Sequence, residues 1–158
     1  MIPSNNEKIN HKKPGKKHIA YCGLCCLDCH GFVQKIPDLA RDLRKELRAS
    51  RYKQFADFMA GTGFGKVFNG YDQCYEVLGA MVKFRCHKGC RDGGGNPFCK
   101  IRKCCMKKGY AGCWQCNDFE DCKKLDFLKG VHDDAHLKNL RILKKKGENA
   151  FLKSKRRW

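Results

Sequence analysis

The most constraining feature of this sequence is its thirteen cysteines in 158 residues. Four of them fall within the stretch YCGLCCLDCH at 21–30, and eight more lie between 86 and 122. A cysteine content this far above the ordinary frequency points to disulfides or metal ligation, because few proteins without either contain so many cysteines. The spacing of the cysteines therefore has to be interpreted before any helix or strand.

The rest of the chain favours metal over disulfides. The first twenty residues contain no apolar stretch of the kind found in a secretory signal, and no run is long enough to span a membrane. We therefore expect a cytoplasmic protein with no membrane contact, in which thiols remain reduced. The odd number of cysteines also fits metal ligation better than a closed set of disulfides.

Cysteines two residues apart are typical of zinc sites, because a tight turn can aim both sulfurs at one ion. Such gaps occur twice between 22 and 29 and once at 113–116, and wider gaps connect the others. The pattern predicts two or three zinc ions. The predicted ligands are drawn from Cys22, Cys25, Cys26, Cys29, Cys86, Cys90, Cys99, Cys104, Cys105, Cys113, Cys116 and Cys122.

An iron-sulfur cluster is the alternative to zinc. Cys22, Cys26 and Cys29 form C-x3-C-x2-C, which resembles the cluster motif of radical S-adenosylmethionine enzymes. Those enzymes need much of a parallel barrel, and this chain is too short and too helical for one. The alternative is therefore an iron-sulfur or thiol redox protein that uses these three cysteines, with an anionic ligand at the Gly93–Gly95 loop. The sequence does not decide whether the chain is an enzyme.

The loop CRDGGGNPFC at 90–99 has two interpretations. Its glycines, Gly93 to Gly95, are flanked by Arg91 and Arg102, so their amides could form a nest that binds an anionic ligand. Alternatively, the glycines simply let the chain bend tightly around a metal site. The second interpretation is favoured, but the loop is the first place to expect a small-molecule site.

A two-cysteine, two-histidine zinc finger is a further alternative. Cys113 and Cys116 are followed, at a suitable distance, by His132 and His136. Cys122 lies closer in sequence and competes for the same ion, so the sequence leaves open whether either histidine is a ligand.

Helical periodicity dominates the rest of the chain. It predicts helices at 36–50, 52–60 and 71–85, and a further helix carrying Leu137, Leu140 and Leu143 that stops at Gly147. The expected fold is mainly α, a small helical domain with irregular cysteine-rich loops organised around the metal sites. The apolar side chains of the predicted helices, including Phe55, Phe58, Met59 and Cys74, are expected to be buried.

The charge distribution suggests the domain limits and a class of partner. The net charge is +18, and Lys and Arg dominate both ends of the chain. We expect a basic disordered arm at 1–17, one metal-binding domain at 18–146, and a basic helix or tail at 147–158. Basic termini of this kind favour contact with nucleic acid or an acidic protein.

Several motifs resemble a known family. The succession IAYCGLCCLDC, GYDQCYEVLGAMVKFRCHKGCRDGGG, CKIRKCCMKKGYAGCWQC and FEDCKKLDFLK is similar to the cysteine-rich bacterial and archaeal proteins of domain-of-unknown-function family 3795. The resemblance spans roughly residues 19–152. It implies metal binding and a cytoplasmic prokaryotic setting but no activity. In that family Cys25 and Cys105 recur only in part, and Cys74 lies outside the pattern.

Overall fold

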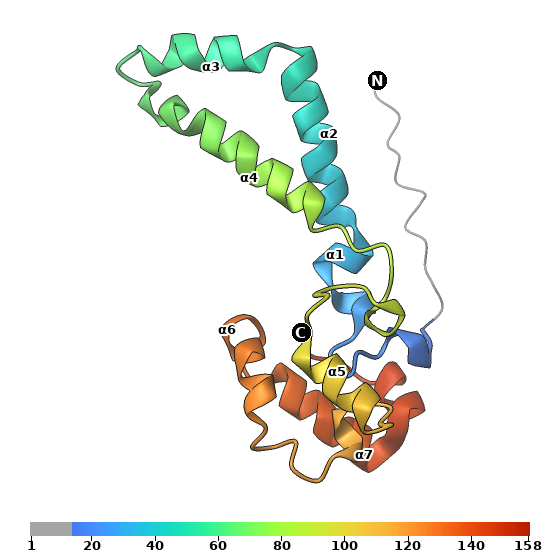
Figure 1. The fold of residues 1–158 in the computed structure, drawn as a ribbon. Coiled ribbons are helices and arrows are strands. Elements are labelled where there is room, and N and C mark those ends of the chain that lie inside the picture. The colour runs from blue at the N-terminus through green and yellow to red at the C-terminus, as the bar shows by residue number, and fades with distance from the viewer. Residues whose placement is uncertain (1–13) are drawn as a thin grey trace.

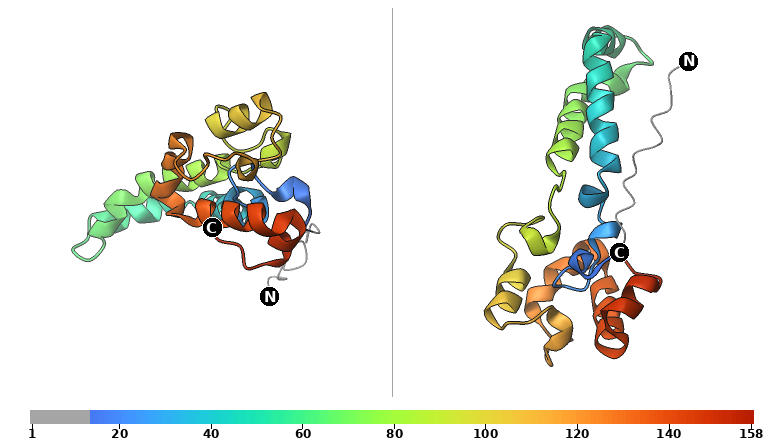
Figure 2. Two further views of the ribbon diagram at one scale, coloured as in Figure 1. Left: turned by 90° about the horizontal axis from the view of Figure 1, so that it is seen from below. Right: turned by 90° about the vertical axis from the view of Figure 1, so that its right-hand side faces the viewer.

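The computed structural model describes residues 14–158, which form a cysteine-rich body and a projecting arm (Figure 1). The body contains residues 14–34 and 86–158, so it is built from both ends of the described chain. The arm, residues 35–85, leaves and re-enters the body at one junction, where the Cys86 amide donates to Gly31 O over 3.0 Å. Two further views show the arm standing away from the body (Figure 2).

The arm contains the three helices that periodicity predicts. α2 (Lys35–Ala49) leads away from the body, α3 (Tyr52–Ala60) crosses the far end, and α4 (Tyr71–Lys83) returns beside α2 (Figure 1). A 3-10 helix, η3 (Lys66–Gly70), joins α3 to α4. The predicted helices at 36–50, 52–60 and 71–85 are therefore confirmed to within two residues at each end.

Aromatic side chains hold the far end of the arm together. The Tyr52 ring lies 5.2 Å from that of Phe55, 6.4 Å from Phe68 and 6.1 Å from Tyr71, measured between centroids. Aromatic pairs at such separations stabilise a fold by more than the burial of their apolar area alone. This cluster therefore connects α3, η3 and α4 although the arm has no conventional core.

The predicted burial of the arm's apolar side chains is wrong. Phe58 is 73% exposed, Leu39 60% and Phe55 47%, and Cys74 is also exposed. The helices have the expected amphipathic pattern, but the arm is a single layer with no body of protein against its apolar face. In α2 and α3 only Pro37, Ala40 and Ala56 are buried.

The body consists of short helices and loops around one core. Its elements are η1 (Lys16–His18), η2 (Cys26–Asp28), α1 (His30–Val33), η4 (Cys90–Asp92), α5 (Lys100–Lys107), η5 (Cys113–Gln115), η6 (Lys123–Leu128), α6 (Lys129–His132) and α7 (Ala135–Lys153). No strand is formed by residues 14–158, whose one isolated antiparallel bridge pairs Ile19 with Cys25. The mainly helical class is therefore confirmed.

The core of the body combines residues from segments far apart in the sequence. Residues from the first cysteine stretch, α5, η5, η6 and α7 pack together in one cluster, and Phe151 is completely buried. The cysteine-rich segment 86–122 is not made only of the expected irregular loops, because it forms α5 and supplies Ile101, Trp114 and Phe119 to the core. Packing rather than thiols alone therefore organises this region.

The sequence predicts a basic arm at one end of the chain and a helix stop near the other. The predicted basic arm at 1–17 lies mainly outside the described residues, although Lys16 and Lys17 begin η1 and Lys16 pairs with Glu148. Near the other end, Gly147 has φ 78° and ψ 172° and breaks α7, which confirms the predicted stop there. The chain then continues as a second short helical segment that includes Phe151.

Candidate functional site

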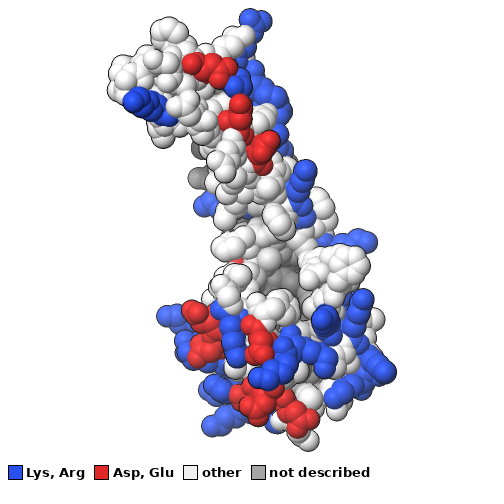
Figure 3. All heavy atoms as spheres, turned by 60° about the vertical axis from the view of Figure 1, so that its left-hand side comes forward, with Lys and Arg blue, Asp and Glu red and all other residues white. Residues whose placement is uncertain are grey.

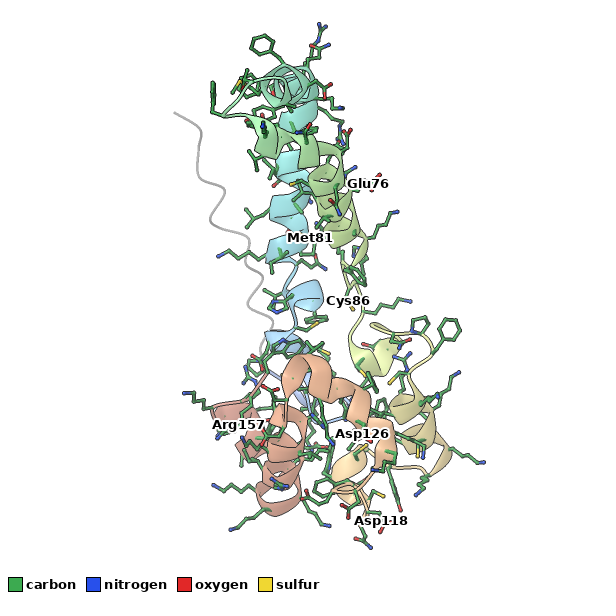
Figure 4. The ribbon with its side chains drawn as sticks, turned by 90° about the vertical axis from the view of Figure 1, so that its left-hand side faces the viewer. Glu76, Met81, Cys86, Asp118, Asp126 and Arg157 are labelled. Carbon is green, nitrogen blue, oxygen red and sulfur yellow. The ribbon has the colours of Figure 1, made fainter. Side chains whose placement is uncertain are left out.

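Twelve of the thirteen cysteines lie in the body or at its junction with the arm, and Cys74 lies alone on α4. Figure 4 places Cys86 where the chain leaves α4 and enters the body. All thirteen are free thiols. Their neighbours divide most of the twelve into groups that sequence spacing alone does not identify.

The first thiol group contains Cys22, Cys26, Cys90 and Cys99. The Cys90 amide donates to Cys26 Sγ over 3.4 Å, although the two residues are 64 positions apart. Cys22 lies close enough to Cys90 and Cys99 for their negative charges to raise its pKa, and Cys99 acts on Cys90 in the same way. The fold therefore joins the stretch 22–29 to the loop 90–99.

Burial is the main influence on the pKa of three thiols in this group, Cys22, Cys26 and Cys90. It raises the pKa of Cys22 to about 12 and that of Cys26 to about 11, and it also raises the pKa of Cys90. Hydrogen bonds from backbone groups oppose this effect only in part. Since a nearby cation favours the thiolate, a bound metal ion would reverse the balance at these residues.

The second thiol group contains Cys105, Cys113 and Cys122. The sulfurs of Cys105 and Cys113 lie 3.6 Å apart in the core. Their hydrogen bond lowers the pKa of Cys105 and raises that of Cys113, so the pair releases its first proton more readily than its second. Cys122 is close enough to act on Cys113 as well.

Adjacent cysteines have different neighbours. Cys104, Cys105 and Cys116 all lie near the Lys108 ammonium, but Cys105 also faces Cys113 in the core. Similarly, Cys26 lies against the Cys90 amide, while the neighbours of Cys25 include Asp28 and Arg156. Each adjacent pair therefore contributes its two sulfurs to different surroundings, as expected where neighbouring side chains point apart.

The thiols are close together but not in coordinating positions. Among the described residues, no three His, Cys, Asp or Glu side chains are arranged to hold one metal ion. The two remaining thiols, Cys86 and Cys29, differ in their neighbours. Cys86 Sγ lies 2.6 Å from Lys88 O, and Cys29 lies near Cys26.

Neither arginine beside the glycine loop is free to bind an anion, as the anion-nest interpretation would require. Arg102 is buried and donates to the carbonyl oxygens of Cys90, Gly94 and Asn96 over 2.8 to 3.1 Å. Arg91 donates to Ala111 O over 2.7 Å. Both guanidinium groups therefore bind carbonyl groups of the protein itself, and Arg102 holds the loop in its bend.

The middle glycine of this loop is required by a close approach. A Cβ at Gly94 would lie only 1.7 Å from Lys88 O, so no larger residue fits there. The two outer glycines have positive φ angles, 86° at Gly93 and 70° at Gly95. These observations support the interpretation that the glycines serve a tight bend.

The last residues of the chain contact the first cysteine stretch. No pattern in the sequence indicates this contact. Arg156 donates to both carboxylate oxygens of Asp28 over 2.8 and 2.9 Å. The completely buried Asn139 bonds the backbone N and O of Arg157. Figure 4 shows Arg157 beside the lower helices of the body, away from the arm.

The candidate finger histidines have aromatic and buried surroundings. The His132 ring lies 4.8 Å from Trp158, whose indole also lies 6.0 Å from His30. His136 is completely buried, and neither of its ring nitrogens has a hydrogen-bond partner among the described residues. Burial lowers the pKa of both His132 and His136, which favours neutral rings.

Comparisons with known proteins identify one family. A model described as "Protein of unknown function (DUF3795)" matches residues 18–127, a span that contains all thirteen cysteines. No curated protein and no solved structure matches the chain. None of the helices in residues 14–158 has the length and apolarity needed to cross a membrane.

Proposed function

The chain belongs to the DUF3795 family of proteins of unknown function, and from this premise we propose that its body binds zinc through cysteine thiolates. The observation that carries the proposal is the first thiol group. It brings Cys22 and Cys26 together with Cys90 and Cys99 from a distant loop. Four soft, anionic sulfur donors are the ligand set of a structural zinc ion.

The proposed ion would act on the fold rather than on a substrate. A four-thiolate site leaves no open position for water, so it stabilises a structure instead of catalysing a reaction. In this body it would tie the stretch 22–29 to the loop 90–99, which are otherwise joined by few hydrogen bonds. The second thiol group, in which Cys105 and Cys113 lie in the core and the partly buried Cys122 packs against it, is the proposed location of another ion.

The iron-sulfur alternative depends on Cys22, Cys26 and Cys29 sharing one cluster. Cys29 does lie near Cys26, but the thiols that act electrostatically with Cys22 are Cys90, Cys99 and Cys113. This arrangement favours a site of four cysteines from two segments over a site of three from one. Zinc therefore remains the proposal, and iron-sulfur chemistry is an outcome of the test.

The test is metal analysis and an absorption spectrum of full-length protein purified without oxygen. We expect colourless protein that contains zinc and no acid-labile sulfide. Cys90→Ser should lower the zinc content by about one ion per chain, since it removes a ligand from the first thiol group. Cys74→Ser makes the same chemical change on the exposed arm and should leave the zinc content unchanged.

Two results would contradict the proposal. Brown protein that contains iron and sulfide would show that the body binds an iron-sulfur cluster instead of zinc. Equal metal content in the Cys90→Ser, Cys74→Ser and unmodified proteins would show that the first thiol group is not a metal site, even if the protein binds zinc elsewhere.

A further inference from the structure

A cavity of about 350 Å³ opens between the start of the described chain and the loop that precedes η4. Lys17 of η1 lies on one side, His87 and Lys88 lie on the other, and Phe32 of α1 supplies an aromatic wall. This volume is at the lower end of the range found for small-molecule sites.

The charge of the cavity favours an anion. Lys17 and Lys88 both line it, and neither has an ion-pair partner within residues 14–158, unlike neighbouring Lys16, which pairs with Glu148. Asp92 is the one carboxylate among the lining residues. Two lysines against one aspartate leave a local excess of positive charge, which attracts anions more strongly in a partly enclosed site.

The remaining walls suit an organic group. Phe32 is half-buried, and its ring meets the buried His18 imidazole edge to face, with the centroids 5.7 Å apart. Gly89 is buried and adds no side chain to the cavity wall. A mixed site of this kind binds a ligand through a few polar contacts and an apolar surface.

We propose that this cavity binds a small organic anion, with its phosphate or carboxylate group between Lys17 and Lys88 and its organic part against Phe32. The inference is independent of the zinc proposal, because no cysteine lines the cavity. The site nevertheless borders the first thiol group, since a Cβ at Gly89 would lie 3.9 Å from Cys26 Sγ. The test therefore uses full-length protein in its purified, metal-containing state.

Phenyl phosphate is a suitable probe because it combines a dianion with a flat ring. Titration calorimetry should show saturable binding of one phenyl phosphate per chain, tighter than binding of inorganic phosphate. The double variant Lys17→Ala/Lys88→Ala should weaken binding about tenfold or more, since each charge-assisted hydrogen bond contributes substantially. The matched control, Lys145→Ala/Lys146→Ala, removes the same charge from exposed positions on α7 and should bind normally.

A second pair of variants changes the charge in the opposite direction. Asp92→Asn removes the carboxylate that lines the cavity and should tighten binding of phenyl phosphate several-fold. Asp118→Asn, on the exposed lower end of the body in Figure 4, should have no effect. Equal effects of both lysine pairs would assign binding to the general basic surface, and the absence of saturable binding would also overturn the proposal.

Discussion

At the scale of single residues, Arg156 and Asp28 form the contact that joins the two ends of the body. They are 128 positions apart, and their side chains are only 20% and 26% exposed. The bidentate geometry also raises the pKa of Arg156, because the Asp28 carboxylate accepts from its guanidinium group. The pair holds the last residues over Cys25, which is completely buried.

Loss of this contact should loosen the end of the chain. Arg156→Ala should lower the free energy of unfolding by about 1–2 kcal/mol, allowing for partial solvent screening. It should also speed alkylation of Cys25, measured by mass spectrometry of labelled peptides.

Arg141 offers a matched control. It makes the same two-pronged contact with Glu120, but the side chains are 54% and 40% exposed. Arg141→Ala should therefore cost less than about 1 kcal/mol and leave Cys25 alkylation unchanged. Equal losses in the two variants would contradict a special role for the Arg156 contact.

At the scale of secondary-structure elements, the break in α7 depends on one glycine. Gly147 has φ 78° and ψ 172°, a conformation that is almost exclusive to glycine. This break lets the chain turn so that Phe151 enters the core. Nothing lies within 4 Å of a Cβ built at Gly147, so any cost of substitution comes from the backbone rather than from a clash.

Gly147→Ala should therefore lower the free energy of unfolding by about 1–3 kcal/mol, measured by chemical denaturation. Gly130, within α6, also has open space around it, but its φ is not positive. Gly130→Ala should be neutral or stabilise the protein by up to about 1 kcal/mol. A neutral result at Gly147 would show that the break is not a strained glycine conformation.

At the scale of the whole molecule, both the body and the arm carry exposed Lys and Arg side chains, and the arm also exposes large apolar side chains such as Phe58. On the face shown in Figure 3, Lys and Arg gather over the body together with some acidic groups. Binding of nucleic acid stays a prediction for this protein. The net charge of +18 favours it, because a chain with such an excess of positive charge attracts phosphate backbones. The exposed lysines of α7 and the last residues are the proposed contacts.

Removing residues 144–158 would not test that prediction, because Phe151 and Arg156 support the fold. A better variant replaces the exposed Lys145, Lys146, Lys153 and Lys155 by Gln. Its binding to duplex DNA, measured by fluorescence anisotropy, should depend less steeply on salt, by up to about 0.9 in the logarithmic slope per lost phosphate contact.

The arm supplies the control for this measurement. Replacement of its exposed Lys35, Lys45, Lys66 and Lys83 by Gln removes the same charge and should leave the slope unchanged. No binding at low salt, or the same change in slope in both variants, would contradict contact through the end of the chain.

The sequence by itself determined the local features of this protein. Periodicity located α2, α3 and α4, and a single glycine marked the break in α7, because both depend on φ, ψ and side-chain spacing within a few residues. The motifs also indicated the family, which the match over 18–127 confirms.

Only the tertiary structure decided how these features are used. It grouped Cys26 with Cys90, directed Arg102 to loop carbonyls and Arg156 to Asp28, and left Phe58 exposed on the arm. These outcomes depend on contacts between residues far apart in sequence, or on the absence of a second layer. An amphipathic pattern specifies which face of a helix is apolar, but the packing of the whole chain decides whether anything covers it.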